Sequence, residues 1–155
     1  MRLRISETMR GSHHFVDSAL GEATDRGFHF IIDWGGAPLE VLNPFSSRFM
    51  SFDTEGVIFV EGLTDGEVPC TGKLTLDYIR SRSLTYELDF DAGDERYHYT
   101  GRKVDVDLRR PLMLVKTHTT CYGMLRRDDG SIVSRSVVHF EPEELLPFVR
   151  SVRLV

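Results

Sequence analysis

The amino-acid sequence predicts an all-β domain, an antiparallel meander of about eight strands that closes into a barrel. Two observations lead to this prediction. Apolar and polar residues alternate with a period of two along much of the chain, which is typical of strands buried on one face. Turn signals rich in glycine and aspartate separate these stretches, so successive strands are expected to pair as hairpins. Closure is expected because an open meander would expose two strand edges.

The strands are expected in chain order, beginning with one over residues 3–15. Further strands are centred on residues 28–34, 57–60 and 74–78, each bounded by a glycine-containing turn. Residues 38–52 are apolar, but Pro44 and the Ser46-Ser47 pair interrupt them. This segment is therefore expected to form an irregular lid.

Two hairpins are the clearest local signals. Within residues 82–107, the four residues Leu84, Tyr86, Leu88 and Phe90 alternate with polar neighbours, including Ser83, Glu87 and Asp89. The turn Ala92-Gly93-Asp94 follows, and the strand pattern resumes at 96–100. The second hairpin joins residues 113–125 to 132–140, where Asp129-Gly130 favours the positive backbone angles of a tight turn.

A short helix is expected after the strands, over residues 142–150. Pro142 suits a first helical turn, Glu143 and Glu144 lie at the positive end of the helix dipole, and Pro147 limits its length. A run of antiparallel strands followed by a late helix resembles the lipocalin-like (calycin-like) barrel. This likeness concerns the fold and implies no particular function.

Length and composition limit the class of protein. With 155 residues, of which 41% are hydrophobic, the chain is expected to form one domain over 1–155. The formal net charge of −5 argues against a nucleic-acid partner. The sequence shows no secretory signal and no apolar stretch long enough to span a bilayer, so a cytoplasmic location is expected. Two cysteines are too few for a disulfide framework.

The predicted interior is rich in aromatic residues, several of which carry polar atoms that need partners when buried. This composition predicts a cavity that binds a lipid-like or other apolar small molecule, and a core filled by side chains is the competing interpretation. The candidate ligand-binding residues are Trp34, Tyr78, Tyr86, Tyr97, Tyr99, His118 and Tyr122.

Other chemistries have weaker support in the sequence. A zinc site built from His29, His98, His118 and His139 is not selected by their spacing, and His118 and Cys121 would point to opposite faces of a strand. Candidate nucleophiles such as Cys121, Ser134 and Ser136 lie in no GxSxG elbow. No metal, cofactor or catalytic residue is therefore predicted. A small barrel enzyme with Tyr and His acid-base chemistry, and a homodimer, stay open as alternatives.

Three short motifs suggest a family resemblance. They are Ser6-Glu7-Thr8-Met9-Arg10-Gly11, residues 54–60 (TEGVIFV) and residues 97–104 (YHYTGRKV). Their order resembles an accessory β region that follows the flavin-dependent part of long bacterial cholesterol-oxidase-like proteins. The chain has no GxGxxG after an opening strand, so the dinucleotide site of those proteins is missing here. The resemblance implies a structural or interaction module associated with a lipid or redox enzyme, such as an oxidoreductase, and no oxidase activity.

Overall fold

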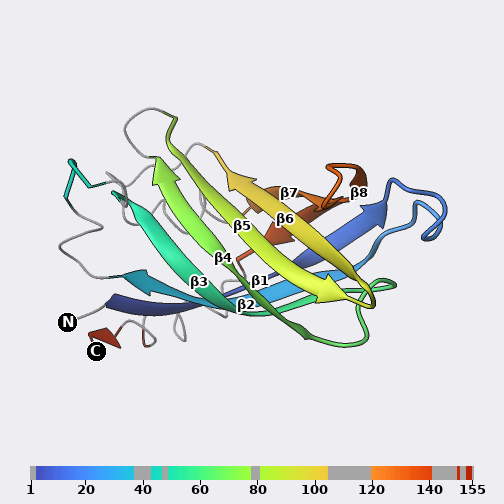
Figure 1. Ribbon diagram of the computed structural model, residues 1–155, viewed down its shortest axis with the longest axis horizontal. Helices are drawn as coiled ribbons and strands as arrows, with labels where there is room; N and C mark the ends of the chain where they lie inside the picture. The colour runs from blue at the N-terminus through green and yellow to red at the C-terminus, as the bar shows by residue number, and fades with distance from the viewer. Residues whose placement is uncertain are drawn as a thin grey trace.

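The computed structural model describes residues 3–36, 43–46, 49–77, 81–104, 120–140, 150 and 153–154. The strands, in chain order, are β1 (Leu3–Phe15), β2 (Arg26–Gly36), β3 (Ser51–Val60), β4 (Val68–Asp77), β5 (Ser83–Ala92), β6 (Glu95–Lys103), β7 (Thr120–Arg127), β8 (Ile132–His139) and the two-residue β9 (Arg153–Leu154). Neighbouring strands pair in the order β2-β3-β4-β5-β6-β7-β8-β1-β9, and an additional β1–β2 pairing closes β1 to β8 into a barrel (Figure 1).

The predicted antiparallel barrel is confirmed. Every strand pairing is antiparallel, and each strand from β1 to β7 pairs with the next one along the chain. Both predicted hairpins are present, with Gly93 and Gly130 in the left-handed region at φ values of 60° and 85°. Glycine tolerates these angles because it has no Cβ atom.

β1 closes the barrel by changing partners along its length. It pairs with β2 from Leu3 to His13, while its other edge pairs with β8 over Arg10–Phe15 and with β9 at Leu3 and Arg4. Within the described part of the chain, this second edge has no strand partner over residues 5–9. We call this stretch the seam.

Some expectations about local structure were wrong or lie outside the described residues. Ser51 and Phe52, expected in an irregular lid, belong to β3, and Phe52 is buried against Trp34 with ring centroids 5.0 Å apart. Ser83, one of the polar residues that alternate with the apolar residues of β5, is only 3% exposed, and its hydroxyl lies 2.5 Å from that of Ser81. The helix expected over 142–150 falls outside the described residues except for Arg150.

The two ends of the barrel differ. Connections 37–50, 78–82 and 104–119 all leave one end, which we call the mouth. Shorter links join β5 to β6 and β7 to β8 at the other end, which we call the turn end. In Figure 1 the chain ends lie on the mouth side, at the left.

A column of aromatic rings fills the turn end and reaches toward the mouth. Successive ring centroids are 5.0 Å apart between Phe15 and His13, 6.1 Å between His13 and Phe28, and 5.1 Å between Phe28 and Tyr99. The Tyr99 ring packs closely against Gly123, where an added Cβ would come within 2.4 Å of the ring. This half of the interior is therefore a packed core.

Candidate functional site

A charged group is enclosed in the mouth half of the interior. Lys103, at the end of β6, donates to Glu7 Oε1 across 3.0 Å, and the two side chains are only 4% and 7% exposed. Tyr86 of β5 donates its hydroxyl to the same carboxylate at 2.8 Å. The Lys103 ammonium also lies 5.3 Å from the centre of the Tyr86 ring. We call Glu7, Tyr86 and Lys103 the polar cluster.

Strand periodicity explains why these charges point inward. Glu7 lies between Ile5 and Met9 on the inward face of β1, and Lys103 continues the inward series of Tyr97, Tyr99 and Gly101 on β6. Burial, followed by the charge of Glu7, raises the pKa of Tyr86 well above its ordinary value. Tyr86 therefore stays protonated and acts as a hydrogen-bond donor at neutral pH.

Two side-chain donors with buried polar atoms lie closer to the mouth than the polar cluster, and neither has a hydrogen-bond partner among the described residues. They are Trp34 Nε1 on β2 and Thr54 Oγ1 on β3. The two residues are opposite each other in the β2–β3 register, and Trp34 is also opposite Ile5, two positions before Glu7. An unpaired buried donor costs about 1–3 kcal/mol. These donors therefore point to an acceptor that a bound molecule would supply.

Some inward-facing residues on the mouth side of the polar cluster are less buried than the cluster itself. Tyr86 is fully buried, whereas Trp34, Leu76 and Leu84, which lie nearer the mouth, are partly exposed. Partly exposed apolar side chains thus lie on the mouth side of the polar cluster. This arrangement of an apolar wall with a few inward polar groups is typical of small-molecule sites.

Two other buried polar side chains, Cys121 and His13, are poor candidates for catalysis. Burial raises the pKa of Cys121 to about 11, so its sulfur is a thiol at neutral pH and a weak nucleophile. Its Sγ atom lies 3.8 Å from the Tyr99 hydroxyl. His13 is held by Ser134 Oγ and the Glu61 carbonyl, both at 2.8 Å, so both ring nitrogens have partners and His13 serves the packed core.

The structure brings together some of the residues predicted for ligand binding and separates others. Tyr86 and Tyr99 are buried inside the barrel, Tyr97 is buried at its turn end, and Trp34 lies inside near the mouth. The expectation that Tyr122 faces the interior was wrong. Its side chain is 61% exposed on the outer face of β7, because Cys121 and Gly123 take the inward positions. Tyr78 and His118 fall outside the described residues.

Sequence reasoning missed Glu7, Lys103 and Thr54. Charged residues are rarely buried, so composition alone assigns Glu7 and Lys103 to the surface. The period-two pattern that identified Tyr97 and Tyr99 would have placed Lys103 inside, had it been continued past Gly101.

The described residues hold no group of three or more His, Cys, Asp and Glu side chains that could bind a metal ion. Over the same residues, the structure has no helix of the length and hydropathy needed to cross a membrane. Comparisons with protein-family models, with curated proteins and with solved structures find no match to this chain. The resemblance to the accessory region of cholesterol-oxidase-like proteins therefore stays a prediction.

Proposed function

We propose that this barrel binds a lipid-like or other amphipathic small molecule in its mouth half. The apolar part of the molecule would lie among the partly exposed residues near the mouth, and its polar end would reach Trp34, Thr54 and Lys103. The observation that carries this proposal is the pair of buried donors, Trp34 Nε1 and Thr54 Oγ1, for which the described residues provide no acceptor.

The enclosed ion pair supports the same proposal. Burying two charges costs several kcal/mol per ion, and apolar residues of similar size are often as stable or more stable in such a position. Glu7 and Lys103 are thus poorly explained by stability alone. An ammonium has three N–H donors, so Lys103 can bind an acceptor on a ligand in addition to Glu7.

Thr54→Val is the sharpest test, because it removes the unpaired hydroxyl and keeps the side-chain shape. The ligand-free protein should be as stable as the wild type or more stable, since an unsatisfied buried group is lost. Binding of oleate, measured by displacement of the neutral dye Nile red, should weaken by about two- to tenfold. Trp34→Phe should behave in the same way.

Thr64→Val is the matched control. Thr64 is also buried, but its Oγ1 accepts from the Val60 N–H at 3.0 Å and lies within 3.3 Å of the Val60 carbonyl. This change should lower stability and leave oleate binding unchanged. The proposal is contradicted if neither Nile red nor oleate binds saturably, or if Thr54→Val and Thr64→Val affect binding equally.

Filling the interior provides a second test. Tyr86→Trp should weaken oleate binding by occupying space at the inner end of the site, whereas Tyr122→Trp on the outer face should not. If oleate binding is unaffected by Tyr86→Trp, the ligand lies elsewhere. The methyl ester of oleate should bind less tightly than oleate, because it carries no negative charge toward Lys103.

A further inference from the structure

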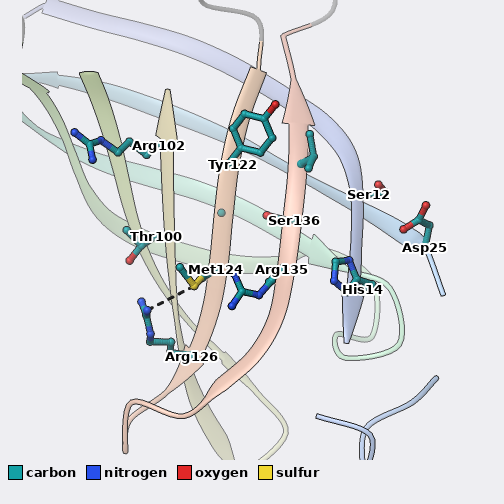
Figure 2. A pocket seen from close by; sticks show the side chains of 12 residues that line it. Ser12, His14, Asp25, Thr100, Arg102, Tyr122, Met124, Arg126, Arg135 and Ser136 are labelled. Atoms are coloured by element: carbon teal, nitrogen blue, oxygen red, sulfur yellow. Dashed lines mark hydrogen bonds between the residues drawn. The ribbon is translucent and has the colours of Figure 1, made fainter. Parts of the chain in front are cut away.

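A groove lies on the outside of the barrel, across β1, β6, β7 and β8. Its volume is about 650 Å³, which falls within the size range of small-molecule sites. Three arginines line it, Arg102 of β6, Arg126 of β7 and Arg135 of β8, together with His14 of β1 (Figure 2). The groove is separate from the interior, because these residues alternate with the inward ones along each strand.

Within the part of the chain that the structure describes, none of the three arginines forms an ion pair with a carboxylate. Other arginines pair with carboxylates, as Arg4 does with Asp33, Arg96 with Asp91 and Arg127 with Asp17. Among the described residues, the contacts of the three groove arginines are to a serine hydroxyl, Ser83 for Arg102, and to a thioether sulfur, Met124 for Arg126. Like charges gathered without counter-charges repel one another, and a bound anion would relieve this repulsion.

The floor of the groove offers an apolar surface beside these charges. Tyr122 is 61% exposed and lies in register with Arg102 on one side and with Val137 on the other. Met124 is in register with Arg135, and Figure 2 shows its side chain between those of Arg126 and Arg135. An exposed aromatic face next to guanidinium groups suits a flat ring that carries negative groups.

We propose that this groove binds a ring-bearing polyanion of the nucleoside phosphate type. Its ring would lie on Tyr122 and Val137, and its phosphates would bind Arg126 and Arg135. Asp25 lies at the opposite rim of the groove, so the negative groups belong on the arginine side. A net charge of −5 would repel a long nucleic acid, whereas one small anion meets only the local field of the arginines.

The test uses ADP, inorganic pyrophosphate and adenosine as probes, with isothermal titration calorimetry on the full chain. ADP should bind more tightly than either pyrophosphate, which lacks the ring, or adenosine, which lacks the charge. The double variant Arg126→Gln, Arg135→Gln should weaken ADP binding by about tenfold or more, and added salt should weaken it in the wild type. Tyr122→Ala should weaken ADP binding and leave pyrophosphate binding unchanged.

Arg96→Gln is the matched control, because Arg96 is an exposed arginine of β6 outside the groove and should not change ADP binding. Unchanged unfolding midpoints would show that the variants are folded. Thr54→Val should leave ADP binding intact, which separates this site from the interior one. The proposal is overturned if ADP does not bind, if it binds no better than pyrophosphate, if the double variant binds it normally, or if a single-stranded oligonucleotide binds in its place.

Discussion

The two ends of the barrel interior bury polar groups in different ways. At the turn end, His13 is satisfied by protein atoms on both ring nitrogens and is packed among aromatic rings. At the mouth end, a carboxylate and an ammonium are enclosed together, and two donors nearby find no partner in the described part of the chain. Unpaired polar atoms are not confined to the mouth end, because Arg26 Nε and Ser136 Oγ are also buried without a partner among the described residues. The enclosed ion pair is what distinguishes the mouth end from the turn end.

The largest effect is expected from removing a ring at the turn end. Phe28→Ala should lower the free energy of unfolding by about 3–5 kcal/mol, because the side chain is 2% exposed and packs against His13 and Tyr99. Urea unfolding measures this change. Phe45→Ala, at a position 97% exposed, should change stability by less than about 0.5 kcal/mol. A loss below about 1 kcal/mol for Phe28→Ala would contradict a packed turn end.

Separating the ion pair should have the next largest effect. Lys103→Met leaves Glu7 charged and buried, and should cost about 3 kcal/mol in the same measurement. This cost lies at the low end of the range for a broken buried ion pair, because Tyr86 still donates a hydrogen bond to Glu7. The double variant Glu7→Leu, Lys103→Met should recover most of the loss, while Lys73→Met on the outer surface should cost little. A double variant no more stable than Lys103→Met would mean that the pair itself stabilises the barrel.

Removing a tyrosine hydroxyl should lower stability by a smaller amount, and the loss should differ between two equally buried tyrosines. Tyr86→Phe removes a donor to a carboxylate and should cost about 1.5–3 kcal/mol. Tyr99→Phe loses a contact to the Cys121 sulfur at 3.8 Å and should cost about 1 kcal/mol or less. Equal losses would indicate that Glu7 is satisfied without Tyr86.

The smallest effect concerns pH and His13. Burial lowers the pKa of His13 below its ordinary value of 6.5, against the opposing hydrogen bond to the Glu61 carbonyl, and Arg26 lowers it further. The unfolded chain therefore takes up this proton more readily than the folded protein, and the contribution of His13 to stability, present above pH 6.5, is lost as the pH falls. The stability advantage of the wild type over His13→Gln should thus shrink between pH 7.5 and pH 5.

His98 provides the control of opposite sign. Hydrogen bonds to Asp128 and Asp89 raise the pKa of His98, so its contribution is present below pH 6.5 and is lost as the pH rises through the folded value. The advantage of the wild type over His98→Asn should therefore grow toward pH 5. If both histidine variants show the same pH trend, the assignment of His13 to the satisfied core is wrong.

Much of the fold could be predicted because strand periodicity and turn chemistry are local signals. For example, the alternation of apolar and polar residues from Leu84 to Phe90 indicates which side chains share one face of the strand. The site was less predictable because it depends on contacts between distant strands, such as Tyr86 with Glu7, which are 79 positions apart. No local pattern indicates that a lysine on β6 and a glutamate on β1 will meet. Likewise, the groove arginines gather only after β6, β7 and β8 are paired.

The seam in β1 has a consequence for how the barrel opens. Closing β1 onto β8 joins residues 121 positions apart, such as His13 and Ser134, so we expect this pairing to form late in folding and to open in local fluctuations. Glu7 lies in the middle of the seam, where β1 has one described strand partner. Amide hydrogens on that edge should exchange with solvent before those of β4 and β5. Water would then reach the enclosed carboxylate through the wall of the barrel as well as through its mouth.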